Sequence, residues 1–402
     1  MLSLIFYSTL FIMRLSRNSI LLICVLLIIV TGCNNKNGGS GGASGIKADI
    51  LKKHHTLKSN KKLLLGLPVK LKYDDITDHL FILDANQRKI IEIGDSSNIV
   101  NEFGGEGKGP GESIRVDNFF ITQKYLYTLD ETQRLINKFS LQDGHYISSL
   151  NYGQLLLKKK NYSKSKTPPP PRFPYYDNNN QPFVTNYGTI LLPTQTGGKH
   201  LYEAVNWKGK KLADIGAIPK GYKAEKNKNK YWATLENRNV PASDLDEAFP
   251  VNDCQDRGDI YLIYPAVPKI AKYSLSGQKI WEHKIPPTPE VDSIMINLSD
   301  FAKLIKNHPQ NNVALIPVRI YIAGRCSSDG DLYLTTYTHP TPKPSKFNRP
   351  LWIQQFSPKG KLIKRYKTGT NIEESPFSAF NFKKHRIFVS SYYSAQVRVY
   401  HF

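Results

Sequence analysis

The sequence predicts an all-β fold, a six-bladed β-propeller with four-stranded antiparallel blades, and three observations lead to it. Six short segments rich in β-branched, aromatic and leucine residues recur between residues 60 and 402, and such residues favour strands. Glycines recur at a fixed distance before several of these segments, where a turn must reverse the chain. Further along several units, a glycine is followed three positions later by an aliphatic residue, a spacing typical of a hairpin.

The six segments align on one apolar or aromatic residue each. These anchor residues are Phe81, Tyr127, Leu191, Tyr261, Tyr333 and Phe388. Glycines lie three residues before three of the anchors, at Gly188, Gly258 and Gly330. An apolar residue lies nine positions after the anchor in four units, at Ile90, Ile136, Ile270 and Val397. This spacing predicts a strand, a tight turn and the next strand in each unit.

A second set of markers places the last hairpin of the unit. The glycine and aliphatic pairs are Gly144 with Ile147, Gly209 with Leu212, Gly277 with Ile280, and Gly360 with Ile363. With one more strand before the first turn, each unit has four antiparallel strands, which is a propeller blade when the unit is repeated radially. A single blade cannot bury both of its faces, so neighbouring blades must cover them.

The last unit ends at Phe402, directly after its third strand. An open edge of this kind needs a partner strand. We expect the apolar segment 62–66, which precedes the first blade, to pair beside the strand that ends at Tyr400 and so to close the ring.

Residues 1–32 are predicted to be a lipoprotein signal peptide. Residues 19–30 are almost wholly apolar and follow Arg14 and Arg17, a pattern typical of an export signal and too short for a comfortable membrane span. The next residues, Val30 to Cys33, resemble the bacterial lipobox, in which the cysteine is acylated and becomes the mature N-terminus. The alternative is a simple signal anchor with an incidental cysteine, and the start of translation is either Met1 or Met13.

Residues 33–59 are expected to be the lipidated cysteine and a flexible tether, because a run rich in glycine and serine follows Cys33. Stable anchoring needs more than one acyl chain, such as palmitate, and the lipoproteins that this segment resembles carry several. Asn34, rather than aspartate, follows the cysteine; by the sorting rule of that class this implies the outer membrane. The propeller is expected to span residues 60–402.

A glycine-rich run from Phe103 to Glu112 resembles a segment of six-bladed, NHL- or TolB-like propeller lipoproteins common in Bacteroidota. Asp84 and Asp130 lie where NHL blades carry an aspartate that closes the second strand, whereas Tyr264 and Ser391 replace it in later blades. The resemblance implies this fold and a location in the cell envelope, and it carries no common activity. We expect the run to be a connection between blades rather than a phosphate loop, because glycine and proline follow Lys108.

The chain is strongly basic, with 55 lysine and arginine residues against 33 acidic ones and a formal net charge of +22. Such a charge favours anionic partners: nucleic acid, anionic lipid or acidic glycan. Export argues against nucleic acid as a partner. The lysine-rich stretches are either solvated loops or contacts to anionic lipid head groups.

A second set of positions lies eight residues before the anchors. Four of these positions are aromatic, at Tyr73, Phe119, Phe183 and Phe380, and are expected to belong to the core between blades. The other two are Asp253 and Arg325, which are expected either to form a salt bridge between adjacent blades or to line the mouth of the central channel and meet a polar ligand. Asp117 and Arg115 are further candidates for that mouth.

Cys254 and Cys326 each lie seven residues before an anchor. They are expected to occupy equivalent places on adjacent inner strands, either as two small buried thiols or as a disulfide, which the envelope permits.

The leading hypothesis is a non-catalytic propeller that binds a protein or glycan partner and needs no cofactor. The alternative is a Ca²⁺-dependent hydrolase or lactonase, because six-bladed lactonases hold Ca²⁺ with Asp, Asn and Glu at the channel. The residues that would converge for this purpose are Glu102, Asp117, Asn118, Asn252 and Asp253. A purely structural envelope protein is a third possibility. The sequence offers one helix candidate, around Asp300 to Lys306, as a cap on the propeller.

Overall fold

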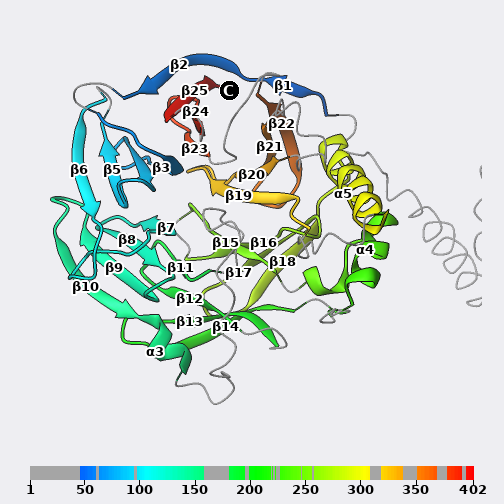
Figure 1. The fold of residues 1–402 in the computed structure, drawn as a ribbon, viewed down its shortest axis with the longest axis horizontal. Helices are drawn as coiled ribbons and strands as arrows, with labels where there is room; N and C mark the ends of the chain where they lie inside the picture. The colour runs from blue at the N-terminus through cyan, green and yellow to red at the C-terminus, as the bar shows by residue number, and fades with distance from the viewer. Residues whose placement is uncertain are drawn as a thin grey trace, which may run out of the picture. The chain divides into compact units, whose positions relative to one another are not determined.

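The computed structural model describes residues 46–59, 63–94, 97–157, 181–194, 199–218, 220, 222, 227–245, 247–255, 258–307, 318–337, 351–368, 378–391 and 395–402. One compact unit runs from Ile46 to Phe402. It contains six β-sheets arranged radially around a centre (Figure 1). The predicted six-bladed propeller with four-stranded antiparallel blades is confirmed. The leader and Cys33 lie outside the described residues.

The first three blades follow one another along the chain. Blade 1 contains β3 (Pro68–Asp74), β4 (His79–Asp84), β5 (Lys89–Ile93) and β6 (Ile99–Gly104). Blade 2 contains β7 (Asn118–Ile121), β8 (Tyr125–Asp130), β9 (Leu135–Ser140) and β10 (Tyr146–Asn151). Blade 3 contains β11 (Phe183–Val184), β12 (Ile190–Pro193), β13 (His200–Val205) and β14 (Lys211–Ala217).

The other three blades complete the ring. Blade 4 contains β15 (Phe249–Asn252), β16 (Ile260–Tyr264), β17 (Lys269–Tyr273) and β18 (Lys279–Lys284). Blade 5 contains β19 (Tyr321–Cys326), β20 (Leu332–Tyr337), β21 (Leu351–Phe356) and β22 (Leu362–Lys367). Blade 6 contains β23 (Ser378–Asn381), β24 (Arg386–Ser391) and β25 (Gln396–His401). The first strand of each blade lies nearest the centre (Figure 1).

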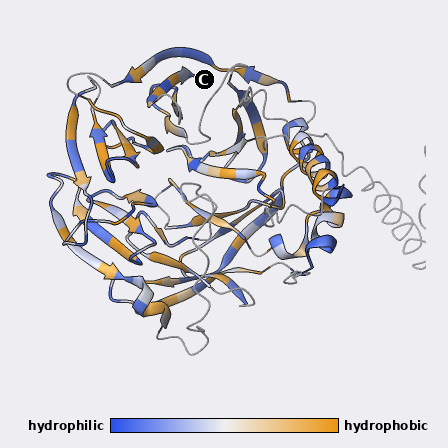
Figure 2. Ribbon diagram, in the orientation of Figure 1, coloured by the Kyte–Doolittle hydropathy of each residue, from blue (hydrophilic) through white to orange (hydrophobic). Residues whose placement is uncertain are grey.

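An N-terminal strand closes the ring, as predicted, but it is not the predicted segment. The fourth strand of blade 6 is β2 (Lys52–Lys58), which pairs antiparallel with β25. The described part of segment 62–66 forms no strand; instead Leu63 and Leu65 are buried between blades 6 and 1. The prediction was wrong because it sought an apolar strand. An outer strand exposes both faces to water, and β2 is accordingly hydrophilic along most of its length (Figure 2).

A second N-terminal strand, β1 (Ala48–Ile50), pairs in parallel with β22 and gives blade 5 a fifth strand. Both β1 and β2 fall within residues 33–59, for which the sequence predicts a tether. The propeller therefore includes chain that precedes residue 60.

The hydrophobic core is divided into layers between neighbouring blades. One layer joins blades 1 and 2, where the ring centroids of Phe103 and Phe139 lie 6.1 Å apart. Another joins blades 5 and 6, with the centroids of Tyr333 and Phe380 5.5 Å apart. Because each apolar face is covered only by the next blade, the stability of one blade depends on the presence of its neighbours.

Helices are few in the described part of the chain. They are α3 (Tyr152–Leu157), α4 (Lys228–Glu236), α5 (Pro289–Asn307) and the short 3₁₀ helix η3 (Ala242–Asp244). The predicted helix around Asp300–Lys306 is present within the longer α5, which packs against α4 at the outer edge of the ring (Figure 1). In the described part of the chain, every helix is too short or too polar to span a membrane.

The glycine-rich run is a connection between blades, as expected. It begins in the last two residues of β6 and leads to β7, and the backbone N–H of Gly109 donates to the Glu112 carboxylate at 2.7 Å. A Cβ atom at Gly107 would lie 1.9 Å from that carboxylate. The loop therefore folds around its own glutamate, which binds the backbone N–H that a phosphate loop would offer to its ligand.

Candidate functional site

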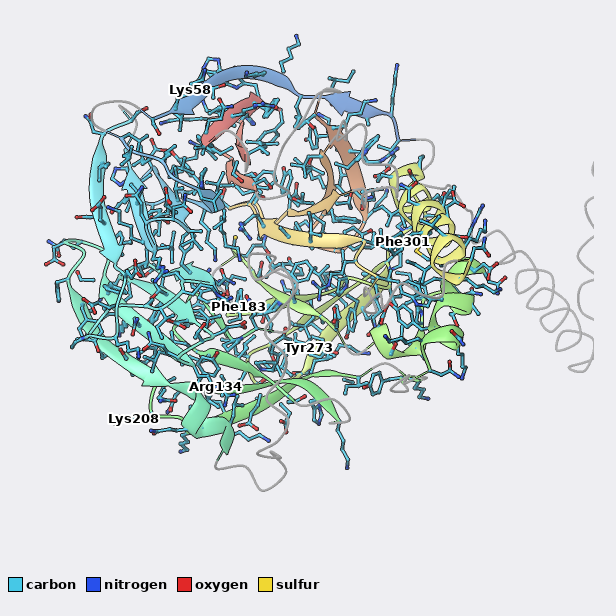
Figure 3. The ribbon with its side chains drawn as sticks, viewed as in Figure 1. Lys58, Arg134, Phe183, Lys208, Tyr273 and Phe301 are labelled. Carbon is cyan, nitrogen blue, oxygen red and sulfur yellow. The ribbon has the colours of Figure 1, made fainter. Side chains whose placement is uncertain are left out.

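A cavity of about 380 Å³ lies at the centre of the ring, within the size range of small-ligand sites. All six blades line it through their innermost strands or the turns that follow. One lining residue from each blade, in chain order, is Lys72, Phe120, Phe183, Asn252, Arg325 and Phe380. Figure 3 shows Phe183 near the middle of the molecule. The cavity reaches the face that carries the turns between the first and second strands of the blades, called here the inner-turn face.

Two cationic side chains enter this cavity from blades 1 and 5. The Lys72 ammonium lies 4.6 Å from the ring centroid of Phe120. The Arg325 guanidinium donates to the Leu71 carbonyl at 3.4 Å and to the Gly324 carbonyl at 2.6 Å. The guanidinium therefore lies against the residue next to Lys72, and the two positive charges share one side of the cavity.

Two acidic residues lie at the rim of the central cavity. Asp74 and Asp75 line the cavity from the turn after β3. One carboxylate oxygen of Asp75 is buried and has no hydrogen-bond partner among the described residues, and burial raises the pKa of this carboxyl group. Asp75 therefore offers a ligand an unused hydrogen-bonding group.

The structure separates the four predicted binding residues. Arg325 alone lines the cavity. Asp253 lies beyond the end of β15, and its carboxylate bonds the Lys272 ammonium at 2.8 Å in a buried pair. The expected Asp253–Arg325 salt bridge is wrong. The prediction assumed that residues eight positions before the anchors occupy equivalent places in every blade. The connection between β15 and β16 spans residues 253–259, whereas the one between β19 and β20 spans only 327–331, so the two positions are not equivalent.

Asp117 and Arg115 lie at the other end of the inner strand of blade 2. The Arg115 Nε atom is 2.5 Å from Asp117 Oδ1, and the buried Asp117 carboxylate also accepts from the Glu131 N–H at 2.8 Å. Burial raises the pKa of Asp117 and raises that of the neighbouring Glu131 to about 8. These residues form an internal ionic cluster away from the inner-turn face.

Cys254 and Cys326 both line the central cavity as free thiols. The Cys254 thiol donates to the Cys326 carbonyl at 2.9 Å, and the Cys254 N–H donates to the Cys326 sulfur at 3.2 Å. The side chain of Cys254 and burial raise the pKa of Cys326, although the Cys254 N–H acts in the opposite direction. The raised pKa makes this thiol a poor nucleophile.

The carboxylates proposed for Ca²⁺ do not converge. Each is bound to a different cation: Glu102 to Lys89 at 2.6 Å, Asp117 to Arg115, and Asp253 to Lys272. Among the described residues, no three His, Cys, Asp or Glu side chains gather in a metal-binding arrangement.

Sequence reasoning missed Lys72 and Asp75. A signal for the first was present, because Lys70 and Lys72 alternate with apolar residues on a strand whose blade faces are both covered. A lysine on such a strand must reach a channel or a buried partner. No comparable signal marks Asp75, whose position depends on the turn after β3.

Comparisons with known proteins agree with this architecture. A family model described as "6-bladed beta-propeller" matches residues 53–166. The chain is a six-bladed β-propeller. The match confirms the resemblance inferred from the sequence over that part of the chain. None of the curated proteins matches the sequence.

Solved structures are similar to the propeller at low identity. A DUF4221 family member from Bacteroides vulgatus is 9% identical, with a TM-score of 0.51 over 87% of this chain and 96% of that one. A protein described as exported, from Bacteroides fragilis, is 12% identical, with a TM-score of 0.48 over 89% and 96%. Virginiamycin B lyase from Staphylococcus aureus is 13% identical, with a TM-score of 0.43 over 88% and 99%. At 9% identity, the match to the DUF4221 family member shows a shared fold alone.

Proposed function

We propose that this propeller is a non-catalytic glycan-binding protein of the bacterial cell envelope. It is held at the outer membrane by acylation of Cys33. The observation that carries the binding proposal is the central cavity, to which every blade contributes.

The lining of the cavity suits a sugar better than a protein surface. Aromatic rings such as Phe183 and Phe380 offer flat apolar faces, while Asn186 and Asn252 offer amide groups for hydroxyls. Lys72 and Arg325 add positive charge, which favours sugars that carry a carboxylate or a sulfate. A recessed cavity of this kind encloses a small polar group rather than a flat protein epitope.

The envelope location rests on the leader, the lipobox-like segment before Cys33 and the glycine-rich run after it. The net charge of +22 would also draw the body towards anionic head groups at low salt. We propose no Ca²⁺-dependent hydrolysis, because each of the three candidate carboxylates is already neutralised by a lysine or arginine.

Binding to neutral and acidic oligosaccharides, measured by isothermal titration calorimetry, tests the proposal. Lys72→Met and Arg325→Met each remove a charge and keep most of the apolar stem. Loss of a charged hydrogen bond corresponds to about 1.5–3 kcal/mol, so each variant should weaken binding of an acidic glycan by roughly tenfold or more.

Lys284→Met, on the exposed strand β18, is the matched control and should bind like the wild type. Equal affinity in both cavity variants and the wild type would refute the cavity as the site. Cleavage of the bound glycan, seen as new reducing ends, would refute the non-catalytic part of the proposal.

A further inference from the structure

A second pocket, of about 400 Å³, lies between blades 2 and 3 on the inner-turn face. It is lined by aromatic side chains: Tyr125 and Tyr127 on β8, Trp207 in the turn after β13, and Tyr187 in the turn after β11. We call it the aromatic pocket. The ring centroids of Tyr127 and Trp207 lie 5.5 Å apart.

A lysine ammonium sits among these rings. The Nζ atom of Lys138, on β9, lies 3.6 Å from the ring centroid of Tyr125, 5.7 Å from that of Trp207 and 6.0 Å from that of Tyr127. In the described part of the chain this ammonium contacts the ring faces and forms no ion pair with a carboxylate. It is a cation held by ring faces alone, so its charge is available to an anionic ligand.

Tyr187 lines the aromatic pocket, and its ring edge approaches the blade 4 turn at Gly258. It is 56% exposed, and it sits at the tip of the turn closed by the hydrogen bond from Gly188 N–H to the Thr185 carbonyl at 2.9 Å. The positive φ of 75° at Gly188 is a conformation that glycine adopts without strain. The turn thus projects a large aromatic ring into solvent at the edge of the aromatic pocket, which is more typical of a binding surface than of a core.

The aromatic pocket and the central cavity are neighbours that share part of their lining. Thr122, Gln123 and Asn186 line both of them. Asn186 is also fixed across blades 3 and 4, because the Asn252 amide donates to its side-chain oxygen at 2.8 Å and accepts from its backbone N–H at 3.2 Å. A chain-like ligand can therefore pass from one pocket to the other over a row of amide and hydroxyl groups.

We propose that the aromatic pocket is a second glycan subsite and that the ligand is an acidic oligosaccharide spanning both pockets. This inference rests on the proposed function and extends it. One sugar ring would stack on Trp207 or Tyr187, and its carboxylate or sulfate would meet the Lys138 ammonium. Another sugar would occupy the central cavity beside Lys72 and Arg325.

The test is the length dependence of binding by the full chain, with uronic-acid oligosaccharides of two, four and six sugars as probes. The wild type should bind the longer probes at least tenfold more tightly than the disaccharide, because they engage both pockets. Tyr187→Ala and Lys138→Met should remove most of this gain and leave disaccharide binding unchanged. Leu212→Ala, at an exposed residue of β14 outside both pockets, and Lys284→Met are the matched controls.

The outcomes separate the two proposals. If Arg325→Met weakens every probe but the aromatic-pocket variants keep the full gain with length, the second subsite is refuted and the central site stands. If those variants weaken the disaccharide as much as the hexasaccharide, the spanning arrangement is refuted. If the wild type binds none of the acidic probes, the proposed function itself fails. Equal gain for neutral oligosaccharides of the same length would refute the assignment of Lys138 as an anion contact.

Discussion

At the scale of single residues, Glu131 carries a buried carboxyl group, and its backbone N–H donates to the buried Asp117 carboxylate. Burial, reinforced by the charge of Asp117, raises the pKa of Glu131 from 4.5 to about 8. The folded protein therefore keeps a proton on Glu131 at neutral pH, whereas the unfolded chain releases it. Between about pH 4.5 and pH 8 the folded state binds more protons, so this residue lowers stability as the pH rises through that window and adds no further loss above it.

Glu131→Gln should remove this pH dependence, because the amide keeps the shape of the protonated acid and has no proton to lose. We expect the melting temperature of the variant to approach that of the wild type near pH 5 and to exceed it by several degrees at pH 8. Differential scanning calorimetry at several pH values measures this difference. Glu102→Gln, at a more exposed residue paired with Lys89, is the control. If the difference in melting temperature between the variant and the wild type is the same from pH 5 to pH 8, the pKa of Glu131 is not raised in the folded protein.

Individual contacts were the part that the sequence could least predict. The anchors locate each second strand, but the pairing of the first strand depends on the length of the turn between them. Tyr333 pairs with Arg325, whereas Tyr261 pairs with Val251 rather than with Asp253. The two extra residues in the turn after β15 place Asp253 in an internal ion pair with Lys272 rather than in the channel. Amino-acid composition does not reveal the length of a turn.

At the scale of elements, the ring is closed by β2, near the start of the described chain, which pairs with β25 near its end. Strand β2 pairs with β25 along most of its length, from Lys52 opposite His401 to Lys58 opposite Gln396. Adjacent residues of a strand direct their N–H groups to opposite sides, so one of any two neighbours donates to the partner strand. Replacing two neighbours by proline must therefore remove a hydrogen bond from this ladder.

His55→Pro combined with Thr56→Pro should open the ring at blade 6 and lower the melting temperature by at least several degrees. Circular dichroism melting curves measure the effect. Leu64→Ala, at a residue that is 68% exposed in the segment first expected to close the ring, should change the melting temperature little. If Leu64→Ala lowers the melting temperature more than the double proline variant does, segment 62–66 rather than β2 closes the ring.

Another joint between elements is the buried pair of Glu290 and Arg365, which links the start of α5 to β22. The two side chains form a bidentate ion pair, Gln354 donates to Glu290 at 2.7 Å, and Arg365 also donates to the Ile46 carbonyl at 2.6 Å. A single arginine thus ties the helix, the outer edge of blade 5 and the N-terminal segment together.

Glu290→Ala should destabilise the fold by about 3–5 kcal/mol, because it leaves the Arg365 charge buried without its partner. Urea unfolding gives the free energy. In the double variant Glu290→Met with Arg365→Met, no charge is left unpaired, and we expect it to recover part of the loss. If the double variant is less stable than Glu290→Ala, the loss of unfolding free energy comes from the missing ion pair rather than from the unpaired Arg365 charge.

At the scale of the whole molecule, repetition made the fold predictable. Six anchors such as Phe81 and Tyr333 recur because every second strand meets the same environment, between two blades. The aromatic pocket, by contrast, lies at one interface, between blades 2 and 3. Periodic features of a propeller can therefore be read from one sequence, whereas its binding site, which breaks the symmetry, needs the structure.

The proposed attachment of the protein to the membrane depends on Cys33 as the acylated residue. If this cysteine is acylated, cells grown with labelled palmitate should incorporate the label into the wild-type protein, and the mature N-terminus should begin at residue 33. Cys33→Ser should lose the label completely, while glycan binding and the melting temperature stay unchanged, since Cys33 precedes the compact unit that starts at Ile46. Cys24→Ser is the control and should still be labelled. A wild-type protein that is found in the membrane without label, with residues 1–32 still attached, would instead show the simple signal anchor.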